Sequence, residues 1–101
     1  MSADLGLTFT GAVIEWRGPA PYFFVRVPEP QSADIQEVAS MASYGWGCIP
    51  VEARIGKVTF TTSLFPKDGG YLLPLKVAVR KPLALAEGSA VTVRMSVHFT
   101  T

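Results

Sequence analysis

Two basic residues stand four positions apart in an apolar stretch of the second half of the chain. Lys76 and Arg80 lie in "YLLPLKVAVRK", residues 71–81, where a strand would place both side chains on one face. Ammonium and guanidinium groups match the oxygens of phosphate and carboxylate. The pair therefore predicts an anion-binding site, and the alternative interpretation is a solvated basic face of a strand.

Aromatic residues could complete such a site by stacking on a ligand. Tyr71 opens the same stretch, and Trp46 stands between two glycines in "GWG". The alternative for both, and for Trp16 and Tyr22, is to close the ends of a barrel, because an aromatic body packs while its polar tip stays in water. The predicted ligand-binding residues are Lys76, Arg80, Trp46 and Tyr71.

Residues that could catalyse a reaction or bind a metal are isolated along the chain. His98 is the one histidine and Cys48 the one cysteine, and this pair offers no ligand spacing for a metal. A Ser-His-Asp arrangement would need His98, Ser63 and an acid to meet without an elbow motif. We expect His98 to be exposed on a strand and Cys48 to be a small buried residue. The sequence predicts no catalytic residue, metal or cofactor.

Strands must position these residues, because most of the chain has an apolar period of two. In the last run, from Val91 to Phe99, every second residue is apolar, which is typical of a half-buried strand. Gly56-Lys57 is expected to form a type II′ hairpin turn, and "PKDGG" a second turn. The other expected strands are 7–16, 22–27, 49–55, 58–64 and 71–79.

One segment has helical spacing. In "SADIQEVASMASYG", residues 32–45, Ser32 is a suitable N-cap and Gly45 a suitable C-terminal residue. A second helical turn is expected at 82–86. The apolar residues that would share one face of the helix are Ile35, Val38, Ala39 and Ala42.

The two halves of the chain follow one pattern. From Gly11 and again from Gly56 the order is glycine, strand, Pro/Gly loop, aromatic residue, apolar strand and closing strand. Such a repeat predicts a pseudo-twofold barrel in which each half completes the core of the other. The expected fold class is mostly β: a small split (double-split) β-barrel of two similar halves with one or two short helices, forming a single domain over residues 1–101.

Length and composition limit the class of protein. The chain has 101 residues, of which 49% are hydrophobic and 17% charged, and these values suit one compact domain. A net charge of +1 argues against a dedicated nucleic-acid or membrane-surface protein. The single cysteine favours a reducing compartment, and the N-terminus lacks the pattern of a signal peptide. We therefore expect a cytoplasmic protein.

Three segments resemble one known family. "WRGPAPYFFVRVP", "GWGCIPVEARIG" and "TSLFPKDGGYLLPLKVAVRK" are similar to the bacterial and archaeal family called domain of unknown function 1905. The resemblance implies a small β-barrel with short helices and no agreed catalytic residues. A second resemblance, of "LLPLKVAVRKPLALAEGSAVTVRM" to the AbrB-type swapped-hairpin regulators, implies DNA binding, although Ser89 and Pro82 depart from that pattern.

The expected function is that of a non-catalytic binding module. Its ligand would be a small anion or an acidic segment of a protein partner, and the module would act as a monomer or homodimer. Nucleic-acid binding of the AbrB type is the first alternative, although the net charge makes it a weaker one. A small enzyme of unknown reaction is the second.

Overall fold

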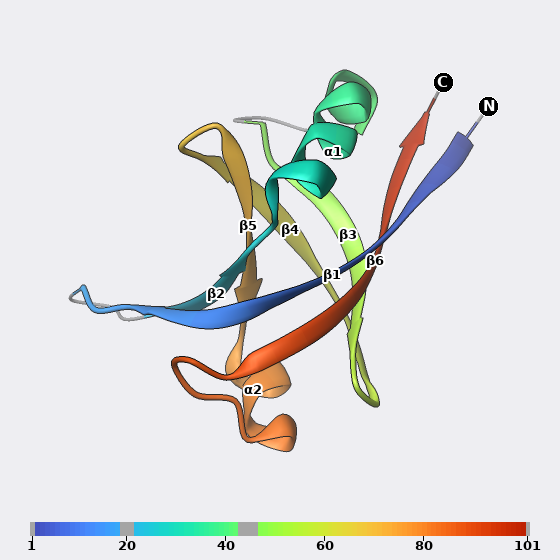
Figure 1. The fold of residues 1–101 in the computed structure, drawn as a ribbon. Helices are drawn as coiled ribbons and strands as arrows, with labels where there is room; N and C mark the ends of the chain where they lie inside the picture. Colours follow the sequence, from blue (N-terminus) through green and yellow to red (C-terminus); the bar gives the residue numbers. More distant parts are fainter. Residues whose placement is uncertain (1, 19–21, 43–46, 101) are drawn as a thin grey trace.

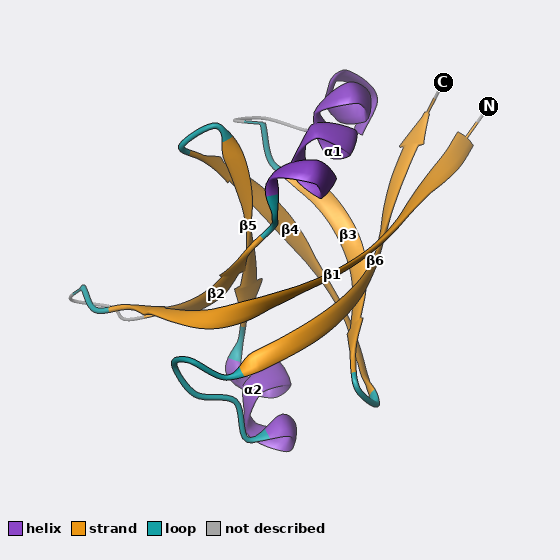
Figure 2. Ribbon diagram, viewed as in Figure 1, coloured by secondary structure: helices purple, strands orange, loops and turns teal. Residues whose placement is uncertain are grey.

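A computed structural model describes residues 2–18, 22–42 and 47–100. In these residues two successive units of strand, strand, helix and strand build one barrel (Figure 1), with strands as the main element (Figure 2). The helix between residues 29 and 42 lies near one end of the barrel, and the second helix lies near the other end. The elements are β1 (Ser2–Trp16), β2 (Tyr22–Arg26), α1 (Glu29–Ala42), β3 (Ile49–Ile55), β4 (Val58–Lys67), β5 (Gly70–Leu75), α2 (Val77–Leu83) and β6 (Ala90–Thr100).

The strands close into an antiparallel barrel in the order β1-β2-β5-β4-β3-β6. Strands β1 and β4 each belong to two sheets. Residues 2–12 of β1 pair with β6 and residues 13–16 with β2, while residues 58–64 of β4 pair with β3 and residues 65–67 with β5. Strands that change sheets in this way form the corners of a barrel. The expected fold class, a mostly β barrel with short helices, is confirmed.

The two halves repeat the same order of elements. Exchanging β1 with β4, β2 with β5 and β3 with β6 leaves the order of neighbours around the barrel unchanged. The starting glycines are nevertheless not equivalent, because Gly11 lies inside β1 and Gly56 lies in the turn between β3 and β4. The two halves align better at the β1–β2 and β4–β5 hairpins, where Trp16, the last residue of β1, corresponds to Lys67, the last residue of β4.

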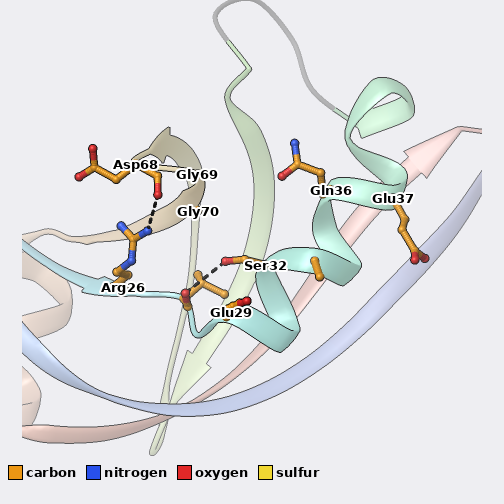
Figure 3. A pocket seen from close by; sticks show the side chains of 10 residues that line it. Arg26, Glu29, Ser32, Gln36, Glu37, Asp68, Gly69 and Gly70 are labelled. Atoms are coloured by element: carbon orange, nitrogen blue, oxygen red, sulfur yellow. Dashed lines mark hydrogen bonds between the residues drawn. The ribbon is translucent and has the colours of Figure 1, made fainter.

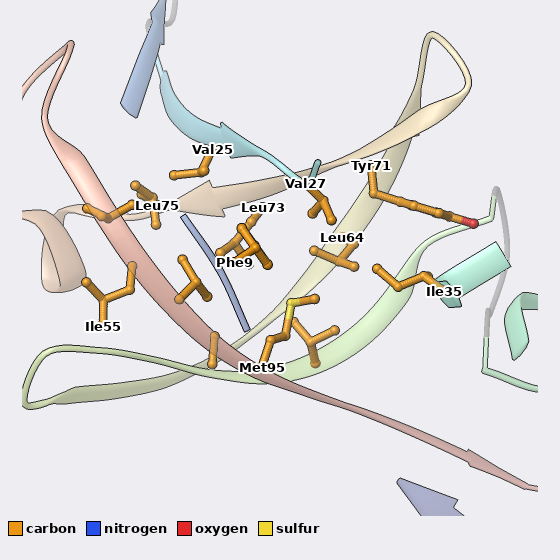
Figure 4. Packing of buried hydrophobic residues seen from close by; sticks show 14 of the residues in the cluster. Phe9, Val25, Val27, Ile35, Ile55, Leu64, Tyr71, Leu73, Leu75 and Met95 are labelled. Atoms are coloured by element: carbon orange, nitrogen blue, oxygen red, sulfur yellow. The ribbon is translucent and has the colours of Figure 1, made fainter. Parts of the chain in front are cut away.

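The interior is filled by alternate residues of the strands, as the period of two predicts. In β3 every second side chain, from Ile49 to Ile55, is buried, and β6 alternates in the same way. Figure 4 shows side chains from both halves meeting in this core. The buried strand residues include Phe9, Val13, Val25, Val51, Leu64, Leu73, Leu75, Val93, Met95 and Val97.

Both predicted hairpin turns are present. Ile55 pairs with Val58 across Gly56-Lys57, and Gly56 alone of the two has a positive φ, 57°, as a type II′ turn requires. Lys67 pairs with Gly70 across Asp68-Gly69, where φ is 51° and 76°, as in a type I′ turn. These two turns set the register on either side of β4.

Helix α1 begins earlier than its sequence predicts. It starts at Glu29 rather than after Ser32, because Pro30 suits a first helical turn. Ser32 is therefore not the N-cap: it is buried in the first turn, and its hydroxyl donates a hydrogen bond to the Val27 carbonyl at 3.1 Å. The predicted apolar face is confirmed, since Ile35 is in the core and Val38, Ala39 and Ala42 pack against it. Gly45 lies outside the described residues.

The predicted strand 71–79 is wrong beyond Leu75. The strand β5 ends there, Lys76 is the N-cap of α2, and Val77–Leu83 is helical. An apolar alternation this short fits a helix as well, because Val79 and Leu83 are four residues apart; Val79 is buried and Leu83 packs against the core. Helix α2 also replaces the turn expected at 82–86. Neither helix is long and apolar enough to cross a membrane within the described residues.

Leu75 and Val77 test whether the strand ends at Leu75. If β5 continued beyond it, both side chains would point to the same face and both would be buried. Leu75→Ala should lower the free energy of unfolding by about 2–5 kcal/mol, since the side chain is 2% exposed and leaves a cavity. Val77→Ala is the matched control: it is 60% exposed, so its effect should stay within about 0.5 kcal/mol. Urea unfolding measures both, and equal losses would contradict the helix at 77–83.

Candidate functional site

The predicted basic pair does not form a strand face. Lys76 is exposed at the N-cap of α2, and Arg80 lies in the last turn of that helix. Nε of Arg80 donates a hydrogen bond to the Leu75 carbonyl at 3.0 Å, and its guanidinium carbon lies 3.9 Å from the centre of the Phe23 ring. A cation over an aromatic face with a backbone partner stabilises the barrel end. Arg80 therefore serves the packing of α2.

The predicted aromatic residues are also separated from that pair. Tyr71 is 4% exposed at the start of β5, and its ring extends toward Ile35 of α1 (Figure 4). Lys76 follows the other end of β5. Tyr71 therefore belongs to the core, where burial raises the pKa of its hydroxyl above the ordinary value of 10.0. Trp46 lies outside the described residues. The site predicted from these residues is not assembled by the part of the chain that the structure describes.

Two other aromatic residues lie on the outside of the barrel. Trp16 and Tyr22 face each other across the end of the β1–β2 hairpin, with ring centres 5.2 Å apart. They are 48% and 39% exposed, so neither ring is buried in the core. Tyr22 also contacts Phe24 and Phe65, with ring centres 5.7 Å and 6.5 Å away. The result is an aromatic ridge on the hairpin.

His98 and Cys48 were the candidates for a catalytic or metal centre. Nδ1 of His98 lies 2.8 Å from Oδ1 of Asp4, and both side chains are mostly exposed. The acid of a catalytic triad is buried, so this pair lacks that environment. Cys48 is a free, half-buried thiol rather than a fully buried one. No three metal-ligating side chains gather within the described residues.

A row of polar residues crosses the outer face of the barrel. Thr8 of β1 is opposite Arg94 of β6, Arg94 is opposite Arg54 of β3, and Arg54 is opposite Thr59 of β4. All four side chains are exposed. Directly opposite residues of antiparallel strands lie about 4.5–5.5 Å apart at Cα. The row therefore places two arginines next to each other with a threonine on either side.

Among the described residues, neither arginine has an acidic partner within ion-pair distance. The ion pairs in residues 2–18, 22–42 and 47–100 join Arg17 to Glu15 and Glu87, and His98 to Asp4. Like charges directly opposite each other destabilise a sheet. Nε of Arg54 donates a hydrogen bond to the Gly56 carbonyl at 2.9 Å, which orients that guanidinium. Glu52 on the same face is the nearest acidic position along β3.

Shallow hollows flank the arginine pair. One, of about 380 Å³, is lined by both arginines together with Thr8, Thr59, Glu52 and Ser96. The other, of about 320 Å³, is lined by Arg54, Arg94, Thr92 and Gly56. Guanidinium and hydroxyl groups offer hydrogen-bond donors to an anion in either hollow.

The row is symmetric with respect to the two halves. Thr8 precedes Trp16 by the same number of positions as Thr59 precedes Lys67, so the two threonines are equivalent. Strand β3 contains Val-Glu-Ala-Arg-Ile at 51–55 and β6 contains Val-Thr-Val-Arg-Met at 91–95, which makes the two arginines equivalent as well. Each half therefore supplies one threonine and one arginine. This repeated Val-x-x-Arg pattern is the sequence signal that marks the two arginines as equivalent, and the pairing of β3 with β6 is what places them opposite each other.

The buried hydroxyl of Tyr71 should make stability fall at alkaline pH. The unfolded tyrosine ionises near pH 10, whereas burial keeps the folded one protonated to higher pH. Its stabilising contribution is therefore complete below pH 10 and is lost as the pH rises through the raised pKa. Tyr71→Phe should flatten this alkaline loss in urea unfolding, and Tyr22→Phe, at an exposed ring, should not. Identical alkaline profiles for Tyr71→Phe and the unchanged protein would contradict the burial.

Comparison with known proteins agrees with the resemblance in the sequence. No curated protein matches the chain significantly. A family model described as "Domain of unknown function (DUF1905)" matches residues 9–95. The match includes β2, α1, β3, β4, β5, α2, most of β1 and the part of β6 that contains Arg94. The chain belongs to the DUF1905 family.

Proposed function

We propose that this protein is a non-catalytic binding module that holds a small dianion between Arg54 and Arg94. The observation that carries the proposal is the row Thr8–Arg94–Arg54–Thr59, in which the two cations are direct neighbours. A dianion such as phosphate or a small dicarboxylate would remove the repulsion between the guanidinium groups. It would also gain charge-assisted hydrogen bonds from both of them.

The charges around the row favour a small ligand over a nucleic acid. Glu52 and Asp4 lie on the same outer face of β3 and β1 as the arginine pair, where they would repel a long phosphate backbone. The net charge of +1 offers few further phosphate contacts. Nucleic-acid binding of the AbrB type and an acidic segment of a protein partner are therefore weaker proposals, and a small enzyme of unknown reaction stays the second alternative. The unpaired thiol of Cys48 supports a reducing compartment such as the cytoplasm.

Arg94→Gln separates binding from folding. Inorganic phosphate at ten times its dissociation constant should stabilise the unchanged protein by about 1.4 kcal/mol, because only the native state binds it. In a chain of this length, each kcal/mol of stabilisation raises Tm by roughly 4–8 °C. Arg94→Gln should abolish the increase. It should leave the phosphate-free Tm equal or slightly higher, since it removes a like-charge pair.

The matched control is Lys81→Gln, which removes an exposed cation from α2 and should keep the full phosphate response. Sodium chloride at equal ionic strength separates binding from screening of the pair. Succinate, an acidic peptide and duplex DNA tested beside phosphate identify the class of anion. If Lys81→Gln loses the response as completely as Arg94→Gln, the arginine pair is not the site. Binding of duplex DNA with stronger affinity than phosphate at physiological salt would favour the nucleic-acid alternative.

A further inference from the structure

A cavity of about 700 Å³ lies between α1 and the turn that joins β4 to β5 (Figure 3). Its volume is within the roughly 300–1,000 Å³ of typical small-molecule sites. Arg26 and Asp68 lie on the side of the turn, and Glu29 and Gln36 lie on the side of α1. None of its lining residues belongs to the hollows beside Arg54 and Arg94. The cavity is therefore a separate place in the molecule.

The guanidinium of Arg26 is held in one orientation at this cavity. Nη1 donates a hydrogen bond to the Lys67 carbonyl and Nη2 donates one to the Asp68 carbonyl, each at 3.1 Å. Gly70 leaves the space for it, because a Cβ there would lie 2.7 Å from Nη2. Two of the five N–H groups are accounted for by these bonds. A fixed, exposed guanidinium with further donors suits a carboxylate.

The opposite side of the cavity is acidic. Glu29, Ala33, Gln36 and Glu37 repeat at helical spacing along one exposed face of α1. Asp68 lies on the side of Arg26, and its carboxylate points away from α1 (Figure 3). None of the ion pairs among the described residues involves Arg26, Glu29 or Glu37. The Arg26 guanidinium on one side of the cavity and the two carboxylates of α1 on the other are therefore not joined by an ion pair.

The acidic groups are too dispersed for a metal ion. No three carboxylate, thiol or imidazole groups of the described residues come close enough to hold one. Separated carboxylates instead suit an extended molecule whose cationic groups are also separated. The Arg26 guanidinium and the two carboxylates of α1 complement a ligand with one carboxylate and two cationic groups.

We propose that this cavity binds a free basic amino acid, of the charge type of L-arginine or L-lysine. The carboxylate of the ligand pairs with Arg26 through charge-assisted hydrogen bonds. Its α-ammonium group and its side-chain cation lie toward Glu29 and Glu37 of α1. Ala33 stands between these two acids on the helix face and leaves room for the aliphatic part of the ligand. Nothing in this proposal depends on the anion site at Arg54 and Arg94.

Isothermal titration calorimetry with three probes tests the charge requirement. L-arginine should bind with one site per chain. Agmatine lacks the carboxylate, and Nα-acetyl-L-arginine lacks the α-ammonium group. Each should bind at least about tenfold more weakly, since a charge-assisted hydrogen bond contributes enough for that factor. Equal affinity for L-arginine and agmatine would overturn the proposal, because it would indicate only attraction of a cation to an acidic surface. The absence of L-arginine binding at 20 mM ligand would overturn it as well.

Variants locate the binding without disturbing the turn that Arg26 supports. Ala33→Leu fills the cavity from an exposed helical position and should abolish L-arginine binding, while its urea midpoint stays near that of the unchanged protein. Glu29→Gln should weaken binding at least about tenfold. Glu52→Gln and Arg94→Gln are the controls, because both residues line the hollow beside the arginine pair and not this cavity. Both variants should bind L-arginine as the unchanged protein does. If Ala33→Leu, still folded, binds L-arginine normally, the cavity is not the site.

Discussion

The antiparallel pairing of β3 with β6 is the interaction on which the rest of the barrel depends. These are the closing strands of the two halves. Their pairing lies between the β3–β4 and β1–β6 pairings, which also join the halves, while β2 and β5 join them on the other side. Neither half has a closed core alone, since residues as distant as Val25 and Val97 are buried in one cluster. Pairing of β1 with β6 brings the two chain ends together (Figure 1). Such long-range pairing means that both halves must form together.

The same pairing determines which polar residues meet on the outside. Strands β3 and β6 are equivalent in the two halves and lie side by side. A residue type that is repeated in both strands can therefore lie directly opposite its equivalent in the other half. Arg54 and Arg94 are in that position. A repeated arginine thus gives a repulsive pair in the free protein, and this pair is the basis of the proposed anion site. The cavity below α1 has a different origin, because it depends on one helix and one turn and has no such symmetric pair.

The sequence predicted the strands better than it predicted the site. Alternation located β3 with its observed ends, and Gly56 and Asp68-Gly69 located two turns, because these signals are local. The stretch 76–80 was misjudged, since four residues that alternate in a strand also fit one turn of helix. The Arg54–Arg94 pair could not be found from local pattern alone. It requires knowing that β3 neighbours β6, which depends on the closure of the whole barrel.

Nitrogen-15 NMR of the arginine side chains tests most directly whether the two halves share one anion site. In a titration with inorganic phosphate, the Nε resonances of Arg54 and Arg94 should both shift and follow one saturation curve with one dissociation constant. The Nε resonance of Arg80, which is held by the Leu75 carbonyl and the Phe23 ring, should stay in place. A shift of only one of the pair, or two curves with different dissociation constants, would contradict a site formed jointly by β3 and β6.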